Sequence, residues 1–156
     1  EFADSIAARV IYPDETHACA FTDRGISFFS SRNQAAVELT SQAEPEESIQ
    51  TVFYSDEYAG FIVRTSGGEN PYRMELYRIN GDPVFTAESN FQYKHADISG
   101  DMVILYNEEA CQIYSTSGTL KYSGGLGMEI QQIRQGRSGS SVIVTGPQVM
   151  KEIRLQ

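Results

Sequence analysis

The sequence predicts an all-β protein made of about three and a half four-stranded antiparallel units. Three observations lead to that prediction. Turn-like segments recur at spacings of 42 and 44 residues, and short apolar runs flank each of them. No stretch keeps apolar residues at the i, i+3, i+4 spacing of a helix over three turns. A β-sandwich or another antiparallel meander is the alternative that the same pattern leaves open.

Each unit is predicted to begin with two short strands joined by an acidic turn. The turns lie at 12–15, 54–57 and 98–101. The strands that precede them are predicted at 6–11, 49–53 and 95–98. The strands that follow them are predicted at 18–21, 60–63 and 102–106. A weaker fourth copy has strands at 130–133 and 142–145, with a loop at 135–140.

The second half of each unit is predicted to be a β-hairpin. Three pairs of matching residues lie 37 positions apart, namely Tyr77 and Tyr114, Gly81 and Gly118, and Phe85 and Tyr122. Asn-Gly and Ser-Gly between apolar residues are typical of hairpin turns, because glycine tolerates the positive φ that these turns require. The counterpart in the first unit has strands at 26–29 and 36–39 around a turn near 31–34, and it lacks the glycine.

Four-stranded units at this period are typical of a β-propeller, whose blades stack because none can bury its faces alone. We expect a single propeller segment over 1–156, with blade-like repeats at about 5–42, 48–89, 93–125 and 129–156. The last repeat supplies a third strand but no outer fourth. The sequence therefore predicts part of a larger ring, either the C-terminal half of a longer protein or a half that closes with a second copy.

The composition and charge of the chain disfavour some classes of function. The chain has 156 residues, 40% of them hydrophobic, and a net charge of −9, which disfavours nucleic-acid binding. Residues 1–60 carry 11 acids and 3 bases, and this acidic flank is interpreted as a solvated face. No apolar run approaches the roughly 20 residues that span a bilayer, so we expect no membrane insertion by this segment. Cys19 and Cys111 are expected to be buried thiols, and no spacing indicates a metal site.

Three segments carry a resemblance to a known family. The stretch 98–107, the residues Ile113-Tyr114 with Ser117-Gly118, and the closing 151–155 are similar to an uncharacterised bacterial family with a domain of unknown function. The resemblance implies a membrane-anchored β-propeller that lies outside the cytoplasm, with one N-terminal transmembrane helix. This chain lacks the anchor and the N-terminal blades, which favours the interpretation as a fragment. The family offers no reaction or functional residues that transfer to this chain.

His95 and Asp97 are the first candidate site residues. Strand alternation places both on one face of the innermost strand of the third blade, with Tyr93 just before them. That arrangement permits a hydrogen bond or a general base, and a ligand in the axial channel would meet it. A polar pair that bridges two blades is the favoured interpretation, because no nucleophile or set of metal ligands accompanies it. If the protein were an enzyme, Arg134 would be the third residue to test together with His95 and Asp97.

Loops supply the remaining candidates. Arg24 lies in the short loop 23–25. Tyr72 and Arg73 close the segment 65–73, which is the longest and most flexible loop expected on this side of the propeller. Exposed tyrosine and arginine contribute strongly to binding, so this segment is a candidate recognition loop. An ordinary elongated hairpin loop is the alternative.

The function predicted from these features is a non-catalytic interaction or ligand-binding module of unknown ligand, outside the cytoplasm. No cofactor is expected, and the partner would be a protein or a small ligand, with a second copy or a partner fragment completing the ring. One alternative is a hydrolase or lyase whose remaining active-site residues lie on absent blades. A second is a carbohydrate-binding module, because nine tyrosines could stack on sugars, although the chain has no tryptophan.

Overall fold

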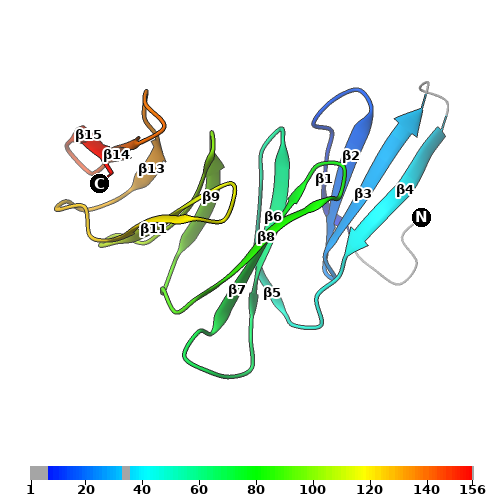
Figure 1. Cartoon of the computed structure of the whole chain (residues 1–156), viewed down its shortest axis with the longest axis horizontal. Helices are drawn as coiled ribbons and strands as arrows, with labels where there is room; N and C mark the ends of the chain where they lie inside the picture. Colours follow the sequence, from blue (N-terminus) through cyan, green and yellow to red (C-terminus); the bar gives the residue numbers. More distant parts are fainter. Residues whose placement is uncertain (1–6, 33–35, 156) are drawn as a thin grey trace. The chain divides into compact units, whose positions relative to one another are not determined.

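The computed structural model describes residues 7–32 and 36–155, and these residues form fifteen strands in four antiparallel sheets (Figure 1). The all-β prediction is therefore confirmed. No helix of the length and hydrophobicity that a membrane span needs occurs in these two ranges. The chain divides into two compact units, Glu1–Asn90 and Phe91–Gln156, and each unit contains two of the sheets.

The first unit holds two four-stranded sheets in which strands pair in sequence order. The first sheet contains β1 (Ala7–Ile11), β2 (His17–Thr22), β3 (Ile26–Arg32) and β4 (Ala36–Ala43). The second contains β5 (Ile49–Tyr54), β6 (Tyr58–Arg64), β7 (Tyr72–Arg78) and β8 (Pro83–Ser89). Each sheet is thus a meander of short hairpins, as the turn signals predict.

Aromatic side chains fill the core of the first unit. Phe21 and Phe28 of the first sheet belong to one buried cluster with Phe61 of the second. The ring of Tyr77 on β7 lies 5.7 Å from the Phe28 ring and 6.0 Å from the Phe61 ring, measured between centroids. Packing at these distances adds to the apolar area that the two sheets bury against each other.

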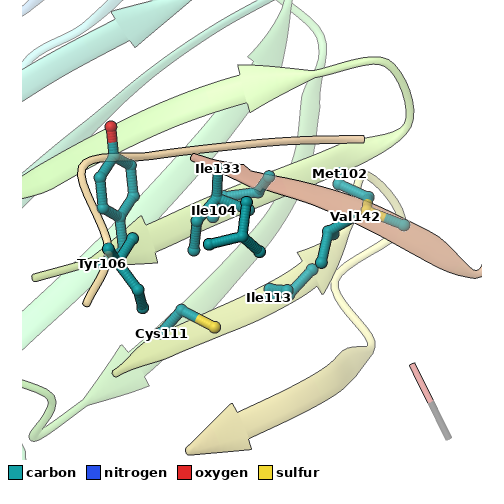
Figure 2. Packing of buried hydrophobic residues seen from close by; sticks show 9 residues of the cluster. Met102, Ile104, Tyr106, Cys111, Ile113, Ile133 and Val142 are labelled. Atoms are coloured by element: carbon teal, nitrogen blue, oxygen red, sulfur yellow. The ribbon is translucent and has the colours of Figure 1, made fainter. Parts of the chain in front are cut away.

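The second unit holds one four-stranded and one three-stranded sheet. The first contains β9 (His95–Ser99), β10 (Met102–Tyr106), β11 (Cys111–Ser115) and β12 (Leu120–Gly124). The second contains β13 (Gln132–Gln135), β14 (Ser141–Thr145) and β15 (Met150–Arg154). Figure 2 shows the core between them, where side chains of β10 and β11 meet those of β13 and β14. A last sheet of three strands is what the sequence predicts.

The structure moves several of the predicted boundaries, among them those of the strands predicted at 130–133 and 36–39. The strand predicted at 130–133 is β13 at Gln132–Gln135, because its pairing with β14 places Ile133 opposite Val144 in the core and continues to Gln135. The strand predicted at 36–39 is β4 at Ala36–Ala43. The buried Ala43 pairs with Ile26 and extends β4 to that point.

Both cysteines are buried and free, as predicted. Burial raises the pKa of the Cys19 thiol to about 11 and that of the Cys111 thiol to about 12. Both side chains therefore act as small apolar groups inside the two cores at neutral pH.

Candidate functional site

His95 and Asp97 lie on one face of β9, as strand alternation requires. In the antiparallel pairing of β9 with β10, His95 is opposite Tyr106 and Asp97 is opposite Ile104. Directly opposed residues share a face of the sheet, so both polar side chains stand beside the core cluster that contains Tyr106 and Ile104. Both are exposed to solvent.

Tyr106 connects the two candidate residues. The His95 ring stacks on the Tyr106 ring with the centroids 4.9 Å apart and an angle of 28° between the planes. The Tyr106 hydroxyl donates a hydrogen bond to the Asp97 carboxylate. Burial raises the pKa of Tyr106, the negative charge of Asp97 adds to that effect, and the positive charge of Arg134 opposes it. The phenol therefore stays protonated at neutral pH and acts as a hydrogen-bond donor.

Tyr106 is buried, and its ring stands at one end of the core cluster in Figure 2, with the hydroxyl oxygen directed away from the other labelled side chains. Tyr106 is not among the candidate residues predicted from the sequence. A count along the hairpin could have found it, because four steps outward from the Ser99–Met102 pair bring His95 opposite Tyr106.

Lys94 fixes the chain just before β9. Its backbone N–H donates to the Tyr106 carbonyl at 2.9 Å, and its ammonium pairs with the Glu108 carboxylate. That hydrogen bond lowers the pKa of Glu108. Tyr93, one of the predicted contact residues, is half-buried in the segment before this anchor.

Gln135 joins β13 to the turn between β9 and β10. Its backbone N–H donates to the Ser99 hydroxyl at 2.9 Å, and its side-chain oxygen Oε1 accepts from the Asp101 backbone N–H at 3.1 Å. Its amide nitrogen also donates to the Asp101 carboxylate. Arg134 precedes Gln135 and is exposed, so the same contacts fix the backbone that carries the guanidinium.

We call the residues His95, Asp97, Tyr106 and Arg134 the β9–β13 array. It presents an imidazole, a carboxylate and a guanidinium to solvent on a buried phenol. Groups of this kind can accept and donate hydrogen bonds to a polar ligand and can pair with either sign of charge. The structure thus places His95 and Asp97 against Tyr106, which was not predicted, and Arg134 where its positive charge acts on the same phenol.

Arg24 lies in the first unit, in the turn between β2 and β3, and is exposed. The Thr22 hydroxyl oxygen accepts from the backbone N–H of Arg24 at 3.2 Å and of Gly25 at 3.1 Å, and so holds this turn. Arg24 lines an open cleft of about 380 Å³ together with the linker 44–48. Three glutamates of the linker make this cleft acidic.

Tyr72 and Arg73 do not lie in a flexible loop, contrary to the prediction. The loop closes at Pro71, whose carbonyl accepts from the Thr65 backbone N–H at 2.9 Å, and β7 begins at the next residue. The Arg73 guanidinium donates two hydrogen bonds to the Glu47 carboxylate, at 2.6 and 2.8 Å, and a third to Glu75 at 2.9 Å. Arg73 lowers the pKa of Glu47 by this contact, and the pair ties the linker to β7.

Four short antiparallel sheets, each built from strands that follow one another in sequence, define a propeller-like protein made of blades. The chain matches the Family of unknown function (DUF5711) over residues 1–155, and it therefore belongs to that family. The family to which the sequence showed a resemblance is thus one of unknown function. No curated protein matches the chain.

Solved propeller structures are similar to this chain at low sequence identity. The WD40 β-propeller domain of Doa1 matches with a TM-score of 0.57 and 12% identity, over 99% of this chain and 53% of that one. BamB from Moraxella catarrhalis matches with a TM-score of 0.58 and 15% identity, over 98% of this chain and 49% of that one. The chain thus spans about half the length of both proteins. The computationally designed Ika4 protein matches with a TM-score of 0.60 and 10% identity, over 100% of this chain and 95% of that one. The predicted propeller fold is confirmed.

Proposed function

We propose that this chain belongs to a non-catalytic binding module of the propeller type and that the β9–β13 array is its contact surface for a polar ligand or protein partner. The observation that supports the proposal is the fixed geometry of the array. Exposed His95 and Asp97 are both held by the buried Tyr106, one by ring stacking and one by a hydrogen bond.

Such a surface loses little conformational freedom when it binds. His95 and Asp97 extend from a strand paired along its whole length, and their contacts with Tyr106 restrict their rotamers before any ligand arrives. Preorganised polar groups on rigid elements bind more tightly than the same groups on loops, because less entropy is lost on association. This favours the array over the loop 65–71 as the binding surface.

The chemistry of the nucleophilic groups supports a role without catalysis. Burial raises the pKa of the Cys19 and Cys111 thiols, so neither offers a thiolate at neutral pH. The pKa of Tyr106 is raised as well, and its hydroxyl is engaged by Asp97. The array is thus better suited to hold a ligand than to attack one.

The location outside the cytoplasm is also part of this proposal. It is supported by the resemblance of residues 98–107 and 151–155 to membrane-anchored proteins. Labelling of intact cells with a membrane-impermeant amine reagent would test it, because Lys94 and Lys121 would react only if this part of the protein faces outward. Labelling only after lysis would contradict the location and leave the binding proposal untouched.

The binding proposal can be tested by an NMR screen of a fragment library with mixed charges. We expect hits to shift the amide resonances of 94–108 and 132–135. The double variant His95→Ala, Arg134→Ala should weaken the best hit by about tenfold or more, because a few central contacts dominate most binding surfaces. Arg78→Ala, an exposed arginine of the first unit, is the matched control and should leave the affinity unchanged.

Hits whose shifts map to other surfaces, or an unchanged affinity in the double variant, would contradict the proposed site. Turnover of a library ester or glycoside that disappears in His95→Ala or Asp97→Ala would instead favour the alternative of a hydrolase. The spectrum of each variant serves as the check that the fold is retained.

A further inference from the structure

The turn between β1 and β2 in the first unit holds an aspartate–histidine pair. Oδ1 of Asp14 accepts hydrogen bonds from the Thr16 backbone N–H at 2.7 Å, the Thr16 hydroxyl at 2.8 Å and the His17 backbone N–H at 2.9 Å. The two carboxylate oxygens also lie 3.0 and 2.9 Å from Nδ1 of the His17 ring. The backbone and hydroxyl contacts already complete the turn, so the imidazole contact is an addition to it.

These contacts determine which ring nitrogen of His17 carries the hydrogen. The hydrogen bonds from Thr16 and His17 lower the pKa of Asp14 to about 2, so the carboxylate is charged across the neutral range. A charged carboxylate beside Nδ1 requires that this nitrogen carry the hydrogen. In the neutral ring the lone pair is then on Nε2, which can accept a hydrogen bond from a ligand.

A half-open pocket of about 250 Å³ adjoins the pair. Its apolar wall is formed by Tyr12, Phe29 and Val37, and its polar side by Asp14, Glu15 and His17. Tyr12 is 76% exposed and Val37 is 67% exposed, so two large apolar side chains of the pocket stand in solvent. Apolar walls with a few convergent polar groups are the usual make-up of a small-molecule site.

The charges at this pocket select the kind of ligand. Among the side chains that the structure describes, its lining includes the carboxylates of Asp14 and Glu15 and no lysine or arginine. An anion would be repelled there, whereas a cation gains from both carboxylates and from the faces of aromatic rings. The volume is below the roughly 300–1,000 Å³ of pockets for drug-sized ligands, which suits a molecule with a single ring.

We propose that this pocket binds a small organic ammonium ion that carries one apolar group. The ammonium donates a hydrogen bond to Nε2 of His17 beside the two carboxylates, and the apolar group packs on Tyr12, Phe29 and Val37. The site lies wholly in the first unit and uses none of the residues of the β9–β13 array. It therefore goes beyond the proposed function and does not depend on it.

Three probes that share one ring separate charge from hydrophobic contact. Benzylammonium, benzyl alcohol and benzoate are titrated in turn at pH 7.5 while the amide resonances of 12–17 and 37 are followed by NMR. We expect saturable shifts with benzylammonium, binding weaker by about threefold or more with benzyl alcohol, and no saturable binding with benzoate. The expected order follows from the two carboxylates.

Two variants at exposed positions test the same contacts. Tyr12→Leu keeps an apolar side chain but removes the aromatic face, and Glu15→Gln removes one charge; each should weaken benzylammonium by about threefold. Leu120→Ala, an exposed apolar residue of the second unit, is the matched control and should not change the affinity. Retained spectra show that the variants fold.

The proposal is overturned if benzoate or benzyl alcohol binds as tightly as benzylammonium, or if none of the three shifts these resonances. It is also overturned if Tyr12→Leu and Glu15→Gln both bind benzylammonium like the parent chain. The aspartate–histidine pair would then be a cap for the turn only.

Discussion

At the scale of single residues, Gly100 lies in close contact with the side chain of Gln135 in the second unit. Gly100 has a φ of +59°, a conformation that favours glycine, and a Cβ there would lie 1.5 Å from Oε1 of Gln135. A side chain at this position must therefore displace the amide that links β13 to the turn between β9 and β10.

We expect Gly100→Ala to lower the free energy of unfolding by about 2 kcal/mol, about half from backbone strain and half from the displaced hydrogen bonds of Gln135. Urea unfolding measures it. Gly127→Ala is a matched control, because Gly127 has a φ of +69° with no atom within 4 Å of the added Cβ, and it should cost about 1 kcal/mol. Equal costs for the two variants, or an unchanged cost of Gly100→Ala in a Gln135→Ala background, would contradict this account.

Asp14 makes the stability of the first unit depend on pH in the acid range. Its folded pKa of about 2 lies below the ordinary value of 3.8, because hydrogen bonds from Thr16 and His17 favour the charged form. A lowered pKa stabilises the fold above pH 4, and that contribution is lost as the pH falls from about 4 to 2. We expect Asp14→Asn to lower the urea midpoint at pH 7 and to approach the parent chain near pH 2. A gap between the two midpoints that stays constant over this range would contradict the expectation.

At the scale of elements, the contact between Arg73 and Glu47 positions the acidic linker. The two parallel hydrogen bonds require the planar fork of a guanidinium, which lysine does not provide. We expect Arg73→Lys to speed hydrogen exchange of the amides in 44–48 several-fold while those of β7 change little. Arg78→Lys, at the other end of β7, is the control. Unchanged exchange in the linker would show that other contacts hold it.

Most strands could be predicted because short apolar runs and glycine turns are local signals. Gly81 and Gly118 both have φ values near +90°, which is what their hairpins require. The errors arose where distant contacts decide the structure. Tyr72 and Arg73 follow a glycine-rich stretch and read as a loop, but pairing with β6 and the contact with Glu47 make them part of a strand.

The candidate site was predictable in part for the same reason. Alternation alone placed His95 and Asp97 on one face, whereas the role of Tyr106 depends on the register between β9 and β10. The pocket beside His17 combines residues from β1, β2, β3 and β4 or their turns, so no local pattern indicates it. Sequence periodicity gives the direction of a side chain but not the neighbours that it meets.

At the scale of the whole molecule, we expect the isolated chain to self-associate. Large apolar side chains are exposed in both units. They are Val37 and Leu39 on β4, Val149 just before β15, and Met150 at its start. Exposed apolar patches of this kind mark interaction surfaces. Light scattering should give a mass of twice 17.4 kDa, or about 35 kDa, and Leu39→Lys should shift it toward the monomer. A mass of 17.4 kDa at the highest soluble concentration would contradict this expectation.

The three-stranded sheet has a consequence for how its last strand can be observed. The Leu155 backbone N–H donates to the Ser140 carbonyl, and the Gly146 backbone N–H donates to the Val149 carbonyl. In the antiparallel register of β14 and β15, these two bonds require that the amides of Lys151 and Ile153 point toward β14. Within the described strands β15 is the last of its sheet, which leaves the amides of Met150, Glu152 and Arg154 on the outer edge. Protection along β15 should therefore alternate residue by residue, and slower exchange at those three amides alone would report the arrival of a neighbouring strand.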